Sequence, residues 1–204
     1  MDTISKLTFR RFLLGQQGLW PGRRFKGLSG TTKAIHQMQG LQLDPLNSVA
    51  RSQEIALYGR VFDFKLGHLY QAAYDKRGFF DYGGWLFMYP MQEFPYWRLH
   101  MKHRQERGMN YESFKHPPAD LLKFVLNELR ARGPLGNRDF SGETVNAWSY
   151  RGRKEASIAL YYLWLIGEVM ITHRKGFDRI YDLCERVLPR EYDYTAPASE
   201  AEDF

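Results

Sequence analysis

The stretch that decides the fold is RKEASIALYYLWLIGEVMITHRKGFDRIYDL, residues 153–183. Residues 168–173 have the alternating pattern that predicts a β-strand. Residues 174–176 predict a basic turn, and residues 177–183 predict a second strand that returns alongside the first. Residues 153–166 precede them with a helical pattern that places on one face Ala156, Ala159, Leu160 and Leu163. A helix followed by a basic-tipped hairpin is the closing part of a winged helix-turn-helix domain.

The residues upstream supply the helix that such a domain needs before its hairpin. Between Ala119 and Arg132, leucine and valine recur at helical spacing. Pro117-Pro118 marks the start of this helix and Gly133-Pro134 its end. The sequence therefore predicts one winged helix over residues 118–189.

The first half of the chain repeats this order. Helices are expected over residues 3–17, 31–42 and 63–76. The last of them is followed by an apolar stretch, a Gly83-Gly84 turn and a second apolar stretch, which together predict a hairpin over residues 78–89. We therefore expect another winged helix here.

The predicted fold class is mainly α with short β-hairpins (α+β), arranged as two tandem winged helix-turn-helix domains. The first covers residues 1–97, a helical linker covers 98–117, and the second covers 118–189. Residues 190–204 form an acidic tail, which we expect to lead into a third domain beyond this chain.

Charge favours an anionic partner. The whole chain of 204 residues carries +6. Residues 190–204 hold one arginine against five carboxylates, a net −4, which leaves residues 1–189 at +10. A body this basic is typical of proteins that bind nucleic acid, although many basic proteins bind nothing anionic.

Composition also indicates the compartment. No apolar run approaches the roughly 20 residues that cross a bilayer, and Arg10 and Arg11 interrupt the apolar N-terminus, so we expect neither a membrane partner nor a signal peptide. Cys184 is the single cysteine, which excludes an intramolecular disulfide and a cysteine-rich zinc site. We expect a cytoplasmic protein, associated with the nucleoid when it binds DNA.

Several common catalytic arrangements are missing from the sequence. It has no glycine-rich phosphate loop, nucleophile-elbow serine or metalloprotease histidine pair. His100 and His103 are three residues apart but have no third donor nearby, so we expect no metal and no cofactor. The nine aromatic residues between Phe79 and Trp97 suit core packing, with stacking on bases as the alternative.

One segment combines apolar anchors with clustered polar groups: LQLDPLNSVARS, residues 41–52. We expect the apolar side chains at 41, 43, 46 and 49 to anchor it. Its polar side chains are Gln42, Asp44, Asn47 and Arg51. Two interpretations stay open from the residues alone: a functional site, or an Asp44 N-cap with Pro45 in the first position of a helix.

This segment resembles the Gln-Φ-Asp motif, where Φ is apolar, of the YcaQ/AlkZ family of winged-helix DNA glycosylases. Ala50-Arg51 resembles the Ala-Arg pair that follows the motif in that family. The resemblance extends over residues 5–200 and includes Gly133-Pro134-Leu135 and the stretch from Gly176 to Pro189. Family members continue into a third winged helix and a β-barrel, so the resemblance implies that this chain is the N-terminal half of such an architecture.

Two details qualify the match. Gln37-Met38-Gln39 fits the Gln-Φ-Gln variant of the motif, but it lies in the expected preceding helix, out of register with Ala50-Arg51. The family's first wing usually carries a histidine, and residues 82–85 contain none.

The resemblance implies a monofunctional DNA glycosylase that hydrolyses the N-glycosidic bond of alkylated or interstrand-crosslinked bases. Asp44 would be the catalytic carboxylate and Gln42 would orient the attacking water. Double-stranded DNA, damaged or crosslinked, would be the partner. The expected DNA-binding residues are Asn47, Arg51, Arg23, Arg24, Gly83, Gly84, Trp85, Arg174 and Lys175. The rival hypothesis is a non-catalytic winged-helix DNA-binding or regulatory protein in which Asp44 only caps a helix.

Overall fold

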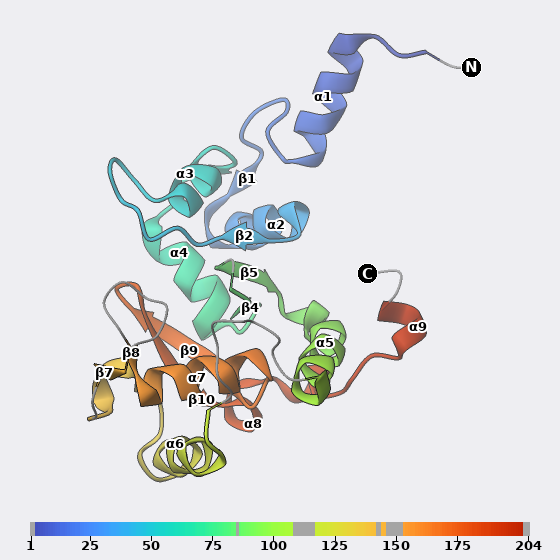
Figure 1. Cartoon of the computed structure of the whole chain (residues 1–204). Helices are drawn as coiled ribbons and strands as arrows, with labels where there is room; N and C mark the ends of the chain where they lie inside the picture. Colours follow the sequence, from blue (N-terminus) through green and yellow to red (C-terminus); the bar gives the residue numbers. More distant parts are fainter. Residues whose placement is uncertain (1–2, 85, 108–116, 142–143, 146–152, 202–204) are drawn as a thin grey trace. The chain divides into compact units, whose positions relative to one another are not determined.

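The computed structural model describes residues 3–84, 86–107, 117–141, 144–145 and 153–201 (Figure 1). Backbone contacts divide the chain into two compact units, unit 1 (Met1–Met91) and unit 2 (Gln92–Phe204). Both units combine helices with short strands, so the α+β class predicted from the sequence is confirmed.

Unit 1 consists of helices around a small sheet. Its helices are α1 (Lys6–Gln16), α2 (Gly27–Met38), α3 (Ser52–Tyr58) and α4 (Leu66–Tyr70), the last extended by a π-helical turn, Gln71–Asp75. A three-stranded antiparallel sheet has the order β2-β5-β4, with β2 (Leu41–Gln42), β4 (Phe79–Tyr82) and β5 (Phe87–Pro90). Two further strands pair in parallel, β1 (Phe25–Lys26) and β3 (Val61–Phe62).

The second helix of unit 1 is displaced from its predicted position. The sequence predicts a helix over residues 31–42, whereas α2 ends at Met38 and the backbone turns at Gln39, which has a left-handed φ of 59°. Gln42 lies in β2 instead, opposite Phe87 of β5. The prediction was wrong because the pairing that makes residues 41–42 a strand comes from residues more than forty positions away in the chain.

Two polar side chains, one half-buried and one buried, donate hydrogen bonds to carbonyl groups at the end of α1. Gln37 Nε2 donates to the carbonyl oxygens of Gly15 (2.8 Å) and Gln16 (2.9 Å). Arg60 donates from Nε to the carbonyl of Gln17 (2.7 Å) and from Nη1 to that of Ala56 (2.8 Å), and burial lowers the pKa of this guanidinium. Gln37 therefore has a structural role in capping α1.

The core of unit 1 includes the aromatic side chains of β4. Phe79, Phe80 and Tyr82 are buried, as are Ile35 of α2 and Met88 of β5. These members of the aromatic-rich stretch therefore serve packing and are not exposed for base stacking.

Unit 2, like unit 1, combines helices with a three-stranded antiparallel sheet. Its helices are α5 (Phe94–Arg107), α6 (Ala119–Arg132), α7 (Glu155–Leu165), α8 (Cys184–Val187) and α9 (Ala198–Ala201). Its three-stranded sheet has the order β6-β10-β9, with β6 (Leu135–Gly136), β9 (Val169–Lys175) and β10 (Asp178–Leu183). A second pair joins β7 (Thr144–Val145) and β8 (Arg153–Lys154), and 3-10 turns occupy Met91–Glu93, Asn137–Asp139 and Arg190–Tyr192.

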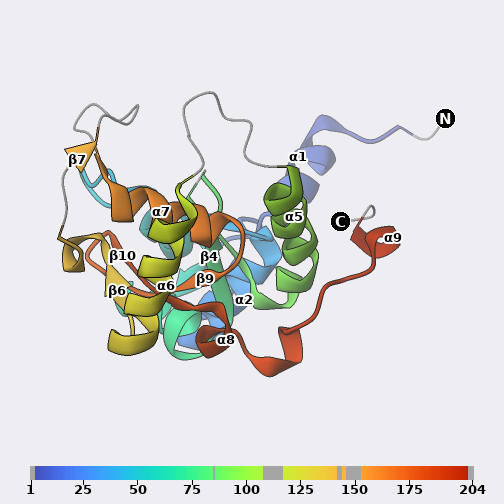
Figure 2. The ribbon, with the colours of Figure 1, turned by 60° about the horizontal axis from the view of Figure 1, so that its bottom comes forward.

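The hairpin and helices of unit 2 follow the sequence pattern closely. Helix α6 has the predicted bounds, Ala119–Arg132, and contacts α7 (Figure 2). Trp164 of α7 is buried, and the guanidinium of Arg179 lies 4.4 Å from its ring centroid. Cys184 begins α8 and is buried, and burial raises the pKa of its thiol to about 11.

The part of the chain that the structure describes contains no helix long and apolar enough to span a bilayer. Within the same residues, no group of histidine, cysteine, aspartate and glutamate side chains is arranged to hold a metal ion.

Candidate active site

The segment from Leu43 to Arg51 is an open, non-helical loop between β2 and α3 (Figure 1). Successive side chains along β2 and its extension alternate between two sides. Leu41 and Leu43 are buried in the core, at 4% and 1% exposure, whereas Gln42 is exposed and Asp44 half-buried. Gln42 and Asp44 therefore face the same, accessible side of this segment.

Asp44 closes a turn within the loop. Its Oδ1 accepts a hydrogen bond from the backbone N–H of Leu46 at 2.8 Å, the pattern of an Asx turn. Helix α3 begins only at Ser52, and its first turn is capped by Glu54, whose Oε2 accepts the N–H of Arg51 at 3.2 Å. The interpretation of Asp44 and Pro45 as the start of a helix was therefore wrong.

Only half of the expected anchors hold the loop. Leu46 is 73% exposed and Val49 95% exposed, contrary to the prediction that they anchor the segment. Its attachment comes instead from Leu43, whose N–H donates to the carbonyl of Leu86 at 2.6 Å, beside the β4–β5 hairpin. Two apolar side chains thus project into solvent a few residues beyond Asp44.

Gln53 also holds the loop, and sequence reasoning did not identify it. Its Oε1 accepts the backbone N–H of Asp44 at 2.9 Å, and its side chain is 1% exposed. Helical spacing could have indicated this residue. Gln53 and Leu57 lie four residues apart in α3 and therefore share one face of the helix, so burial of Leu57 implies burial of Gln53.

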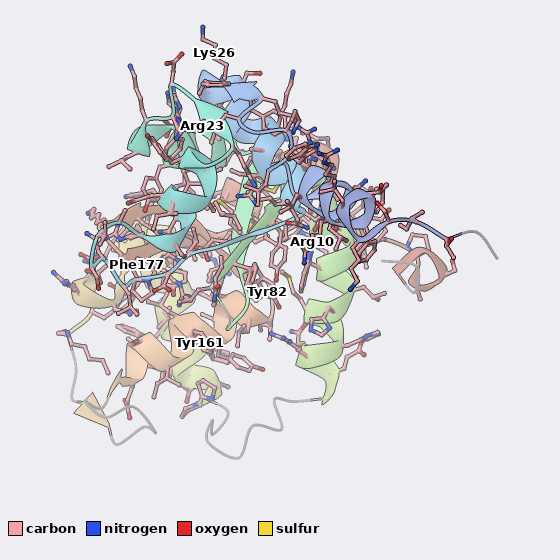
Figure 3. All side chains as sticks on the ribbon, turned by 90° about the horizontal axis from the view of Figure 1, so that it is seen from above. Arg10, Arg23, Lys26, Tyr82, Tyr161 and Phe177 are labelled. Carbon is pink, nitrogen blue, oxygen red and sulfur yellow. The ribbon has the colours of Figure 1, made fainter. Side chains whose placement is uncertain are left out.

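Three of the arginines expected to bind DNA already have contacts within unit 1. The Arg51 guanidinium lies 3.9 Å from Glu54 Oε1. Arg23, labelled in Figure 3, lies 3.8 Å from the ring centroid of Tyr58 in α3. Its hydrogen bond and positive charge lower the pKa of Tyr58. Arg24 donates to the carbonyl of Gly15 at 3.0 Å.

The remaining expected contacts of unit 1 lie on its loop and hairpin. Asn47 is exposed in the Leu43–Arg51 loop. Gly83 has a left-handed φ of 83° in the β4–β5 turn, where the N–H of Leu86 donates to its carbonyl at 3.2 Å, and Gly84 is exposed. Trp85 lies outside the described residues.

The β9–β10 hairpin of unit 2 carries the other two expected DNA-binding residues. Arg174 folds back on the turn: Nη1 donates to the carbonyl of Phe177 at 2.9 Å, and the guanidinium lies 4.5 Å from the Phe177 ring centroid (Figure 3). Lys175 is exposed. The structure describes this hairpin within unit 2, separately from Asp44.

These features describe a basic α+β chain in which an amide, on β2, and a carboxylate, at the start of the following loop, are both accessible to solvent. The chain matches the family model for AlkZ-like DNA glycosylases over residues 35–203, and it belongs to this family. Membership indicates a role in DNA repair, with DNA as the partner. No solved structure matches the chain significantly.

Proposed function

We propose that this protein hydrolyses the N-glycosidic bond of alkylated or interstrand-crosslinked bases in double-stranded DNA. Asp44 is the general base and Gln42 orients the attacking water. The observation that carries the proposal is that these two side chains share the accessible side of a segment whose opposite side, Leu41 and Leu43, is fixed in the core. Family membership supports the same reaction class.

The proposed reaction needs no group beyond water and these side chains. As the C1′–N bond of the nucleotide lengthens, its electron pair moves to the base, and the sugar acquires oxocarbenium character that the Asp44 carboxylate stabilises. Water then forms the new bond to C1′ and gives its proton to Asp44. An alkylated base that already carries a positive charge leaves as a neutral molecule, so the step proceeds without a strong general acid.

Gln42 has the functional groups that its role requires. Its amide carries one acceptor oxygen and two donor hydrogens, so it can accept a hydrogen bond from the water while it donates hydrogen bonds elsewhere. Because Gln42 is exposed in β2, its side chain is free to meet a substrate that approaches Asp44 from solvent.

DNA binding in this proposal uses two winged helices. In unit 1 the order is α2, β2, α3, α4 and the β4–β5 hairpin, and in unit 2 α6, β6, α7 and the β9–β10 hairpin follow the corresponding order. In each sheet the short strand pairs with the last strand of the hairpin. We assign the winged helices to residues 1–97 and 118–189, joined by residues 98–117, with cytoplasmic DNA on the nucleoid as the substrate.

Contacts to the phosphates are assigned to Arg23, Arg24, Arg51 and Lys175, with Arg174 supporting the second wing. Gly83 and Gly84 have no side chains, so in this proposal the tip of the first wing can approach a groove of the DNA closely. Trp85 follows them in the sequence. Asn47 lies on the loop that carries Asp44.

The test is a gel assay for abasic sites on duplexes that carry N7-alkylguanine or an interstrand crosslink. The wild-type protein should release the damaged base, and Asp44→Asn should lower the rate by about 1,000-fold, within the range for a general base. Binding of the Asp44→Asn variant to the same duplex should be retained. DNA binding by both proteins with no base release from either substrate would favour the non-catalytic DNA-binding protein instead.

A further inference from the structure

The side chain of Gln53 is the one contact that joins α3 to Asp44 among the hydrogen bonds described above. Gln53 occupies the second position of α3, nine residues after Asp44, and accepts its N–H through Oε1 at 2.9 Å. Asp44 Oδ1 is meanwhile held by the N–H of Leu46. The backbone and the carboxylate of Asp44 are thus fixed by two separate bonds.

The orientation of the Gln53 amide is determined by its partner. The Asp44 backbone nitrogen is a donor, so the Gln53 atom facing it has to be the oxygen, and Nε2 points elsewhere. Nε2 is buried, and no described residue lies within hydrogen-bonding distance of it. The fold therefore buries an amide whose two donor hydrogens are not used.

This arrangement costs stability. A buried donor without a partner destabilises the folded state, and an apolar side chain of the same shape avoids that cost. Leu57, one turn further along the same face of α3, is apolar and fully buried, so Gln53 is the polar member of a buried helix face. A buried polar group that is only half satisfied calls for an explanation other than stability.

We propose that Gln53 is a positioning residue for Asp44: its Oε1 fixes the Asp44 backbone so that the carboxylate meets the water at the reacting sugar. The inference rests on the proposed function. It explains why an extended loop, which has exposed Leu46 and Val49 and no helical hydrogen bonds of its own, can hold a general base in place. A displacement of about 1 Å can reduce a reaction rate by about 100-fold.

Three variants test this role. Gln53→Met keeps the length and burial of the side chain but removes the acceptor oxygen. Gln53→Glu keeps an oxygen at the same reach. Thr31→Val is the matched control, because Thr31 is a fully buried polar residue of the same unit whose Oγ1 donates to the carbonyl of Gly27 at 3.0 Å, within α2.

The variants are compared in single-turnover base release, DNA affinity and thermal unfolding. Gln53→Met should lower the rate constant of base release by about 100-fold while the Kd for DNA is unchanged. Its Tm should stay within about 3 °C of wild type, because one lost hydrogen bond is offset by removal of the unpaired donor. Gln53→Glu should recover at least a tenth of the wild-type rate, and Thr31→Val should retain the full rate.

Amide hydrogen exchange at Asp44 gives a readout that does not depend on activity. The Asp44 N–H should be protected in wild type and Gln53→Glu and lose protection in Gln53→Met. Equal protection in wild type and Gln53→Met, or a wild-type rate of base release in Gln53→Met, overturns the inference. Absence of base release by wild type, with the exchange pattern as expected, overturns the proposed function and with it the catalytic purpose assigned to Gln53.

Discussion

Units 1 and 2 each have an aspartate shortly after the short strand of the three-stranded sheet, but the two aspartates have different surroundings. In unit 1, Leu41 and Gln42 pair with Met88 and Phe87; in unit 2, Leu135 and Gly136 pair with Tyr181 and Ile180. Each short strand is followed by an aspartate, Asp44 or Asp139. The two aspartates, however, make different hydrogen bonds.

Asp139 turns back onto its own strand. Its Oδ2 accepts the N–H of Gly136 at 2.7 Å, which closes the 3-10 turn Asn137–Asp139. Asp44 binds forward, to the N–H of Leu46, and its own N–H is held by Gln53. A tight turn in unit 2 thus takes the place of the longer loop of unit 1, and in unit 1 the strand residue before the loop is Gln42, whose amide side chain is exposed.

The partner of the aspartate differs for a steric reason. Gln42 is exposed, whereas Gly136 is buried, and a Cβ at position 136 would lie 2.8 Å from Ile180 Cδ1 and 3.1 Å from the carbonyl oxygen of Arg179. Unit 2 therefore has no room for the amide that unit 1 carries. In the proposed function, the chemistry therefore belongs to unit 1, and unit 2 contributes to DNA binding.

Apart from changes to Asp44 itself, Gln42→Ala is expected to have the largest effect on base release. It removes the amide side chain that unit 2 lacks at the corresponding strand position. Because the water loses one of its two orienting groups, the single-turnover rate of base release should fall by about 100-fold. Fluorescence anisotropy should give an unchanged Kd for the damaged duplex. A wild-type rate in this variant would show that Asp44 acts without Gln42.

The converse change, Gly136→Ala, should destabilise the fold. The new methyl group would lie 2.8 Å from the end of the Ile180 side chain and 3.1 Å from the carbonyl oxygen of Arg179. Because Ile180 has to repack and the carbonyl has to move by a few tenths of an ångström, unfolding by urea should show a loss of about 1 kcal/mol. Ser29→Ala, an exposed change in α2, is the control and should leave the urea midpoint unchanged. An unaltered midpoint for Gly136→Ala would mean that unit 2 tolerates a side chain at this position.

The smallest effect is expected at the second wing. Lys175 is exposed while Arg174 is turned onto Phe177, so Lys175→Ala should weaken DNA binding more than Arg174→Ala does. Loss of one phosphate contact should reduce the slope of log Kd against log salt by about 1. Base release at saturating DNA should be unchanged, because the change affects binding alone. A reduced rate at saturation would give the wing of unit 2 a part in the chemistry.

Long, well-capped elements could be predicted from the sequence. Helix α6 was located to the residue because prolines precede it, a glycine follows it, and its apolar spacing is regular. The β9–β10 hairpin was located by its basic turn and the strands on either side. Both depend on local signals, which a single sequence contains.

The surroundings of Asp44 could not be predicted, because distant residues determine them. Strand β2 has two residues and exists only through its pairing with β5, and Leu43 is held by Leu86. The same local pattern, aspartate before proline, is compatible with a helix cap and with an Asx turn. Gln53 and Glu54 decide between them, the first by binding Asp44 and the second by capping α3.

The central claim is that Asp44, and not the corresponding aspartate of unit 2, carries out base hydrolysis. The direct test compares single-turnover release of N7-alkylguanine from duplex DNA by wild type, Asp44→Asn and Asp139→Asn. We predict a loss of about 1,000-fold in Asp44→Asn and a rate within about twofold of wild type in Asp139→Asn, whose carboxylate serves only a turn. Equal rates in wild type and Asp44→Asn, or a comparable loss in Asp139→Asn with its fold intact, would contradict the account.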